Sequence, residues 1–477
     1  MFSKLFQRKN HQRDMTSGNL FTKIILFAIP AMLTTMMQLF YVTIDLTTVH
    51  YGDSAESMGA IASNNALINL IVVVFSGVSL GVNVIISEAK GANNPEKAEK
   101  VMHTSLLFAL ISGVAVGALG FFISDDLLRL MGTEVHYLEK ATLYLRIYFC
   151  GLPFLMIYNY AGQMLRAQGD SRTPFFILTA TGIFNVAFDC LFVFPMKMGV
   201  AGVGLATIMA EAVSCVLAVL ALAKGPRAFV RFSFKKLRID RTSLHEVLRV
   251  GLPAGLQGFF FSLPNVFIQS SLYTIDPGNV NLENGATASA NIEGYFHACV
   301  DAICVSVMTF VAANVGAKSK GNIKKVFLIG LAWGSIFCAG IALVTATLYR
   351  PLLSLFVDSE ESIAAGQQRL SVMGYLYFFE LTMHLTASVL RGLRYSSYPM
   401  FSTLVFCTGL RILLILTVFP LEFFHTVVWL YALFPITWFL ATLANGIALI
   451  ILLPKSLRKI DESLALEAKE AAVDVVS

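Results

Sequence analysis

Long apolar runs recur along the whole chain and are separated by short polar segments. A helix needs about 20 mostly apolar residues to cross the hydrocarbon core of a bilayer. Backbone polar groups in lipid must be bonded internally, and the ten-residue alternation of barrel strands is missing, so the runs predict α-helices. The twelve expected spans are 21–48, 58–86, 102–123, 142–163, 174–196, 199–223, 247–274, 286–313, 326–349, 369–390, 399–419 and 427–453.

Composition agrees with this pattern, because 56% of the residues are hydrophobic and only 14% are charged. An average soluble chain is about a quarter charged. A soluble enzyme, a disulfide scaffold and a disordered regulator are therefore excluded, and an all-α integral membrane protein is expected. The 7 cysteines lie inside apolar runs without paired spacing, which predicts small buried hydrophobic residues.

Lys and Arg concentrate in alternate loops, which sets the expected orientation. The most basic loop, 224–241, lies between two spans, so a position at the cytoplasmic membrane surface is favoured over nucleic-acid binding. Both tails are basic near the membrane, and an even number of spans places both termini in the cytoplasm. The basic residues of this loop and of the first tail are Lys224, Arg227, Arg231, Lys235, Lys236, Arg238 and Arg241, and Arg8, Lys9 and Arg13.

The sequence repeats weakly at a spacing of 225 residues. Leu165-Arg166 matches Leu390-Arg391, and near the start Pro30 matches Pro253 with a slip of two. Each repeat holds six spans, so both halves enter the membrane from the same side, as in transporters whose two lobes rock around a central site. The expected division is a 1–20 tail, a 21–223 N-lobe, a 224–246 basic linker, a 247–453 C-lobe and a 454–477 tail.

Ionisable residues deep in a span are costly and usually functional. In the N-lobe, Tyr41 and Asp45 are four residues apart on one helix face, as are Asn185 and Asp189, and Thr207 and Glu211. These oxygen-bearing groups suit Na⁺, or two carboxyl groups that share a proton. A structural polar network between helices is the alternative.

The C-lobe carries a second set of candidates. Glu293, His297 and Asp301 form a stripe on one helix face, and Glu380, His384 and Arg411 lie in later spans. Arg411 needs a partner among Glu380, Glu293 and Asp301, and an ion pair with Glu380 that fixes packing is favoured. The candidate site for a cationic substrate or a second ion comprises Glu293, Asp301, Glu380 and Arg411. Within it, Glu293 or Asp301 is the candidate to bind the cation. A zinc site from His297, His384 and carboxylates has no signature spacing and is disfavoured.

Five motifs stand out in the first half of the chain: Ala28-Ile29-Pro30, Ser87-Glu88-Ala89-Lys90-Gly91-Ala92-Asn93-Asn94, Leu165-Arg166-Ala167-Gln168-Gly169-Asp170, Asn185-Val186-Ala187-Phe188-Asp189 and Gly202-Val203-Gly204-Leu205-Ala206-Thr207. Together they resemble the multidrug and toxic compound extrusion (MATE) family. The N-lobe is most similar to the DNA-damage-inducible-protein-F-like branch, which implies a conformational role for the Pro30 helix kink and a cation-coupling site. Its implied members are Tyr41, Asp45, Asn185, Asp189 and Thr207, with Na⁺ at Asp45, Asn185, Asp189 and Thr207. Another branch of the family has a Glu eight residues after the proline of the seventh span, which is Pro253 here. Phe261 occupies that position in this chain.

The resemblance implies a secondary active exporter of small organic, cationic compounds, in antiport with Na⁺ or H⁺ by rocking of two lobes. It is not expected to be an enzyme or to need any cofactor besides the coupling ion. A monomer in a bacterial plasma membrane, surrounded by lipid and without a nucleic-acid partner, is expected. A lipid-linked oligosaccharide flippase and a specific metabolite exporter of the same superfamily remain the alternatives.

Overall fold

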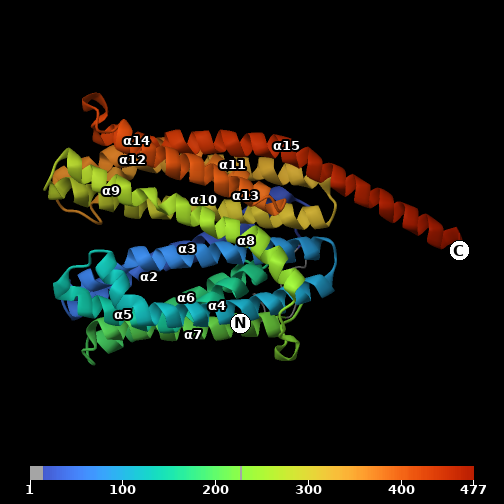
Figure 1. Ribbon diagram of the computed structural model, residues 1–477, viewed down its shortest axis with the longest axis horizontal. Helices are drawn as coiled ribbons and strands as arrows, with labels where there is room; N and C mark the ends of the chain where they lie inside the picture. The colour runs from blue at the N-terminus through green and yellow to red at the C-terminus, as the bar shows by residue number, and fades with distance from the viewer. Residues whose placement is uncertain (1–13, 226–227, 477) are drawn as a thin grey trace. The chain divides into compact units, whose positions relative to one another are not determined.

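The computed structural model describes residues 14–225 and 228–476, and helices make up nearly all of both ranges (Figure 1). The predicted all-α fold is confirmed. The basic residues Arg8, Lys9, Arg13 and Arg227, and the expected 1–20 tail as far as residue 13, lie outside the described residues.

The first half of the chain forms helices α2 to α7, and the second half forms α8 to α15. The first set is α2 (Leu20–Gly52), α3 (Ala55–Gly91), α4 (Pro95–Leu130), α5 (Val135–Ala167), α6 (Arg172–Val193) and α7 (Gly199–Lys224). The second set is α8 (Arg241–Ser262), α9 (Pro264–Ile275), α10 (Val280–Gly316), α11 (Lys320–Leu353), α12 (Glu360–Gly392), α13 (Ser397–Ser402), the π-helical η3 (Thr403–Leu410), α14 (Arg411–Thr417) and α15 (Val427–Val476).

Within the described ranges, 10 helices are long and apolar enough to cross a membrane. Two of the twelve predicted spans are not among these ten helices. The run 247–274 is divided between α8 and α9, because Pro264 begins a new helix. The run 369–390 lies in α12, whose Arg369, Glu380 and Arg391 lower its hydropathy. The chain is a multi-pass membrane protein whose helices fit the expected twelve-helix architecture.

The repeat is visible in the helix boundaries. Helices α5 and α12 begin and end at positions 225 residues apart, as do the ends of α3 and α10. The loops that follow also match, because Asn93 and Lys318 both have positive φ angles, of 50° and 54°. Since few non-glycine residues adopt this conformation, the same turn geometry has been used twice.

The chain divides into two compact units, and the first helix of each half is shared between them. Unit 1 contains the described residues up to Ala28, the segment Gly91–Asn93 and everything from Leu256 onward, and unit 2 contains the rest. Helix α2 therefore passes from unit 1 to unit 2 just before Pro30, and α8 passes from unit 2 to unit 1 just after Pro253.

Within unit 2, α3 and α8 cross at a pair of glycine motifs. Gly77 and Gly81 on α3 meet Gly251 and Gly255 on α8. A Cβ atom at Gly81 would lie 2.4 Å from the carbonyl oxygen of Val247, and one at Gly255 would lie 2.3 Å from that of Val74. Small residues four apart let helix backbones approach this closely in membranes, so the crossing requires glycine at these positions.

The linker after α7 folds onto α4 within unit 2. The Ser233 amide donates to Nε2 of His103 at 3.0 Å, and Lys236 forms an ion pair with Glu99 at 2.6 Å. Asp240 caps α8 by accepting a hydrogen bond of 2.8 Å from the Ser243 amide. Hydrogen bonds from the side chain and backbone of Ser243 hold the pKa of Asp240 below its usual value. The basic segment is thus held against α4 in its middle and at the start of α8.

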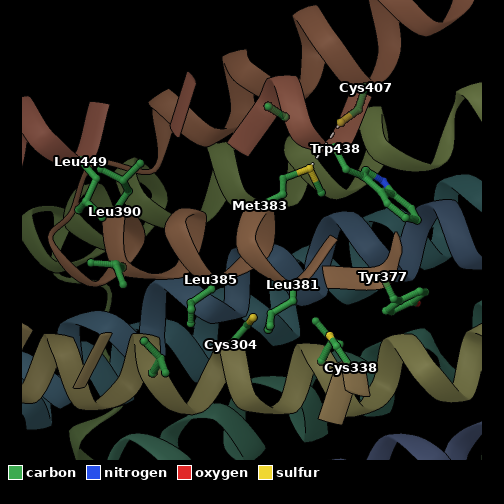
Figure 2. Close-up of a cluster of buried hydrophobic side chains, with 14 of the residues drawn as sticks. Cys304, Cys338, Tyr377, Leu381, Met383, Leu385, Leu390, Cys407, Trp438 and Leu449 are labelled. Atoms are coloured by element: carbon green, nitrogen blue, oxygen red, sulfur yellow. Dashed lines mark hydrogen bonds between the residues drawn. The ribbon is translucent and has the colours of Figure 1, made fainter. Parts of the chain in front are cut away.

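Unit 1 has a large apolar core in which α12 is central. Figure 2 shows Leu381 and Leu385 of α12 beside Cys304 and Cys338, while Cys407 donates to the Met383 sulfur at 3.5 Å. All 7 cysteines lie in the described ranges, and all are free. Five are buried, as predicted. Cys150 and Cys190 are exposed, so the prediction of burial was wrong for these two, which lie on outward-facing sides of α5 and α6.

The amino-terminal segment belongs to this core. Met15 is 2% exposed, and its carbonyl accepts a hydrogen bond of 2.9 Å from Asn314 on α10. The carbonyl of Thr16 accepts another, of 2.6 Å, from Asn322 on α11. Two side-chain amides therefore fasten the segment that precedes α2 to helices of the second half.

We expect Gly81→Ala to destabilise the protein, because the added methyl group would collide with the α8 backbone. Overpacking of this kind costs about 1–3 kcal/mol. The thermal unfolding midpoint of the purified protein measures the effect. Gly340→Ala is the control, since a Cβ at that α11 position meets nothing within 4 Å. Equal midpoints for the two variants would show that the crossing is loose.

Candidate functional site

The two N-lobe aspartates face each other within unit 2. Asp45 lies on α2 and Asp189 on α6, and their carboxyl groups are within hydrogen-bonding reach of one another. Asp189 is 0% exposed. No donor group among the described residues reaches either of its oxygens, nor Oδ1 of Asp45. An ionised carboxylate can only accept hydrogen bonds, so this pair forms one only when a proton is held between the two groups.

Helix α5 contributes two tyrosines to the same region. Tyr144 is 6% exposed and lies close enough to Asp45, Asp189 and Glu211 to sense the charge of each, and Tyr148 lies near Glu211. Neither tyrosine was identified from the sequence. Their spacing of four residues on one face of an apolar helix was the available signal.

Glu211 reaches the same helix from α7. A Cβ atom at Gly151 would lie 2.8 Å from Oε2 of Glu211, so the missing side chain of this α5 glycine makes room for the carboxylate. Three acidic side chains, from α2, α6 and α7, thus surround one face of α5.

The other predicted members of this site are Asn185, Tyr41 and Thr207, and the hydroxyls of the last two are bonded to backbone carbonyls. The Nδ2 atom of Asn185 is buried without a partner among the described residues. The Tyr41 hydroxyl donates to the carbonyl of Thr179 at 3.4 Å, and that of Thr207 donates to Val203 at 2.9 Å. A hydroxyl that donates to the backbone keeps its oxygen lone pairs, so Tyr41 and Thr207 can still offer an oxygen to a cation.

Unit 1 contains an ion pair that sequence analysis missed. Arg369 on α12 donates to both carboxylate oxygens of Glu293 on α10, at 2.9 and 2.8 Å. The guanidinium also lies over the Tyr431 ring, 5.3 Å from its centroid. Arg369 is the first residue of a predicted span, where an arginine is usually assigned to the interface. Since Glu293 is neutralised here, it is less available for a substrate cation than the sequence suggested.

The expected ion pair between Arg411 and Glu380 is absent among the described residues, so that prediction was wrong. Glu380 instead accepts a hydrogen bond of 2.7 Å from Nδ1 of His297. Arg411 is 0% exposed, donates to the Thr437 hydroxyl at 2.6 Å, and lies 4.2 Å from the centroid of the Phe434 ring. The cation is stabilised by a hydroxyl and an aromatic face in place of a carboxylate.

A duplicated bundle of apolar helices, with ionisable side chains held inside each half, defines a membrane transporter of the two-lobe type. The MatE family model matches residues 30–191 and 284–417, which together exceed half of the chain. The protein belongs to this family, that of the multidrug and toxic compound extrusion transporters, and the predicted resemblance is confirmed.

Individual relatives are distant but extensive. The chain is 25% identical over 438 residues to the probable multidrug resistance protein YoeA of Bacillus subtilis, covering 87% of this chain and 93% of the relative. It is 27% identical over 305 residues to an FAD transporter of Shewanella oneidensis, covering 63% and 67%. A solved MOP superfamily transporter from Pyrococcus furiosus shares the fold, with a TM-score of 0.86, 19% identity and coverage of 95% and 100%.

Removing one partner of the Glu293–Arg369 pair should destabilise the protein strongly. An unpaired charge left in this buried position costs about 3–5 kcal/mol. We expect Arg369→Gln and Glu293→Gln each to lower the thermal unfolding midpoint, and the double variant to lose less than the sum of both. Strict additivity in this double-mutant cycle would contradict a direct interaction.

Proposed function

We propose that this protein is a secondary active exporter of small organic compounds, driven by inward movement of Na⁺ or H⁺. The observation that carries the proposal is the Asp45–Asp189 pair, two carboxyl groups that face each other without a basic partner among the described residues. Two ionised carboxylates in such a place repel each other, so the pair favours occupancy by a proton or a cation. Loss of that ion leaves charges that the site must stabilise in another way.

Helix α2 belongs partly to unit 1 and partly to unit 2, which supports a link between ion binding and conformation. Asp45 lies on the part of α2 that belongs to unit 2, and the same helix enters unit 1 just before Pro30. Proline removes a backbone hydrogen bond and weakens the helix locally. Bending at Pro30, and at the matching Pro253 of α8, would let the two units rock while the chain stays continuous. Ion binding drives such a change only if one conformation binds the ion more tightly.

The surroundings of the pair suit either ion. Asn185 and the hydroxyl oxygens of Tyr41 and Thr207 would complete an oxygen cage for Na⁺, whereas the carboxyl groups alone can hold H⁺. No other cofactor enters the proposal. We propose a bacterial plasma membrane location with cytoplasmic termini, as the basic loops indicate.

The names of several relatives favour drug-like substrates, since YoeA and others are described as multidrug resistance proteins. We propose that these substrates are cationic, as the resemblance to the family implies. One observation favours a specific exporter of an anionic metabolite as second candidate. Arg391 and Arg411 of unit 1 are both buried, and each has a side-chain nitrogen without a partner among the described residues. These atoms could bind a carboxylate or phosphate.

Asp45→Asn should abolish substrate export and leave the fold intact, because the amide cannot exchange a proton or balance a cation. Asp189→Asn should have the same effect. The measurement is drug efflux from cells or proteoliposomes, alongside the size-exclusion profile. The matched control is Asp126→Asn, an exposed aspartate of the same unit. Full efflux by the Asp45 variant would rule out the proposed coupling site.

Imposed gradients should identify the coupling ion. A Na⁺ gradient and a pH gradient should be applied separately to proteoliposomes. We expect one of them to drive substrate transport, and that gradient identifies the coupling ion. An organic cation and an anionic dinucleotide should be tested in parallel to separate the two substrate classes. Flux that responds to neither gradient would exclude antiport.

A further inference from the structure

A group of metal-ligating side chains lies in unit 1, in the half of the chain that does not hold the aspartate pair. His297 on α10 and Glu380 and His384 on α12 each present one ligand atom, and the three atoms lie within 4.8 Å of one another. The sequence disfavours a zinc site from these residues, because the two histidines are 87 residues apart. The packing of α10 on α12 nevertheless brings the three side chains together.

The shorter contacts show how the group is arranged. Nδ1 of His297 lies 2.7 Å from Oε1 of Glu380, and Nε2 of His384 lies 3.9 Å from the same oxygen. The ligand atoms of a tetrahedral zinc ion, with bonds of about 2.0–2.2 Å, are roughly 3.4 Å apart. Side-chain shifts on the order of 1 Å would therefore convert the present contacts into a coordination site.

Two atoms of the group lack hydrogen-bond partners among the described residues. They are Nε2 of His384 and Oε2 of Glu380, and both are buried. Glu380 is only 2% exposed, and its carboxylate also has the Tyr377 side chain within hydrogen-bonding reach. A cation bound between Glu380 and His384 would give Nε2 of His384 the partner that it lacks.

The three side chains of the group differ in their exposure. The side chain of Glu380 is 3% exposed and that of His384 13%, whereas that of His297 is 40% exposed. The Phe261 ring lies 6.4 Å from the His297 ring and 5.3 Å from the His384 ring, which restricts water around the imidazoles. Asp301, one turn after His297, is close enough to influence both histidines and could be a fourth ligand.

We propose that His297, Glu380 and His384 form a binding site for a divalent transition-metal ion, of which Zn²⁺ is the best match. Imidazole ligands favour zinc, cobalt and nickel over sodium, magnesium and calcium, which prefer oxygen. The metal takes the place of the hydrogen between His297 and Glu380, which leaves as a proton to solvent. The nearby cations Arg391 and Arg411 weaken the attraction, so affinity in the micromolar range is expected.

The test is a Co²⁺ titration of the purified full-length protein in detergent, carrying an affinity tag without histidine and first stripped with a chelator. Co²⁺ bound by nitrogen and oxygen in a tetrahedral site gives visible absorption bands, and Zn²⁺ should abolish them by competition. We expect one ion per chain. Both His384→Gln and Glu380→Gln should lower the affinity by about 100-fold, at least as much as changes around metal ligands do.

The matched control is His136→Gln, which removes an exposed histidine paired with Glu134 at 3.2 Å. It should bind Co²⁺ like the unmodified protein. Equal affinities of the unmodified protein and His384→Gln, with both showing the same size-exclusion profile, would overturn the proposal and leave a hydrogen-bonded His–Glu–His network. The Asp45→Asn variant should keep the metal site, so a failure here is separable from a failure of the transport mechanism.

Discussion

The energetic cost of placing charge where water is scarce governs the interior of this protein. In unit 1 two buried carboxylates are matched from a neighbouring helix: Glu293 by Arg369, and Glu380 by His297. Even Arg411 has a hydroxyl and an aromatic face. Asp45 and Asp189 are the exception, because they have only each other. A pair without a basic partner among the described residues is the physical basis of the ion coupling that we propose.

The duplicated halves show how one architecture can serve different chemistry. Helices α5 and α12 share their boundaries at the repeat spacing, yet Tyr144 on α5 matches Arg369 on α12. The tyrosine borders three carboxyl groups, whereas the arginine neutralises one. The backbone plan was retained in both copies, and the polar residues diverged, so a site found in one lobe does not predict its counterpart in the other.

Sequence reasoning reached the helices and the repeat, because these depend on apolar run length and on spacing along the chain. The two aspartates lie on different helices, and they were grouped through the resemblance of their motifs to a known family. Without such a motif, sequence reasoning failed where partners come from different helices. The ion pair expected between Arg411 and Glu380 does not form among the described residues, because helix packing brings His297 to Glu380 instead. Arg369 was overlooked at the edge of a span. Distances between helices follow from side-chain packing across the lobe. A single sequence contains no pattern from which this packing can be read.

The anchoring of Met15 and Thr16 has a consequence for biogenesis. These residues are made before their partners Asn314 and Asn322, which follow about 300 residues later. A ribosome adds roughly 5–20 residues per second, so the amino terminus waits at least about 15 seconds for them. During that time the first helix is inserted but incompletely docked. The contact therefore closes only after most of the chain has entered the bilayer, and its formation reports that synthesis has passed well beyond the midpoint.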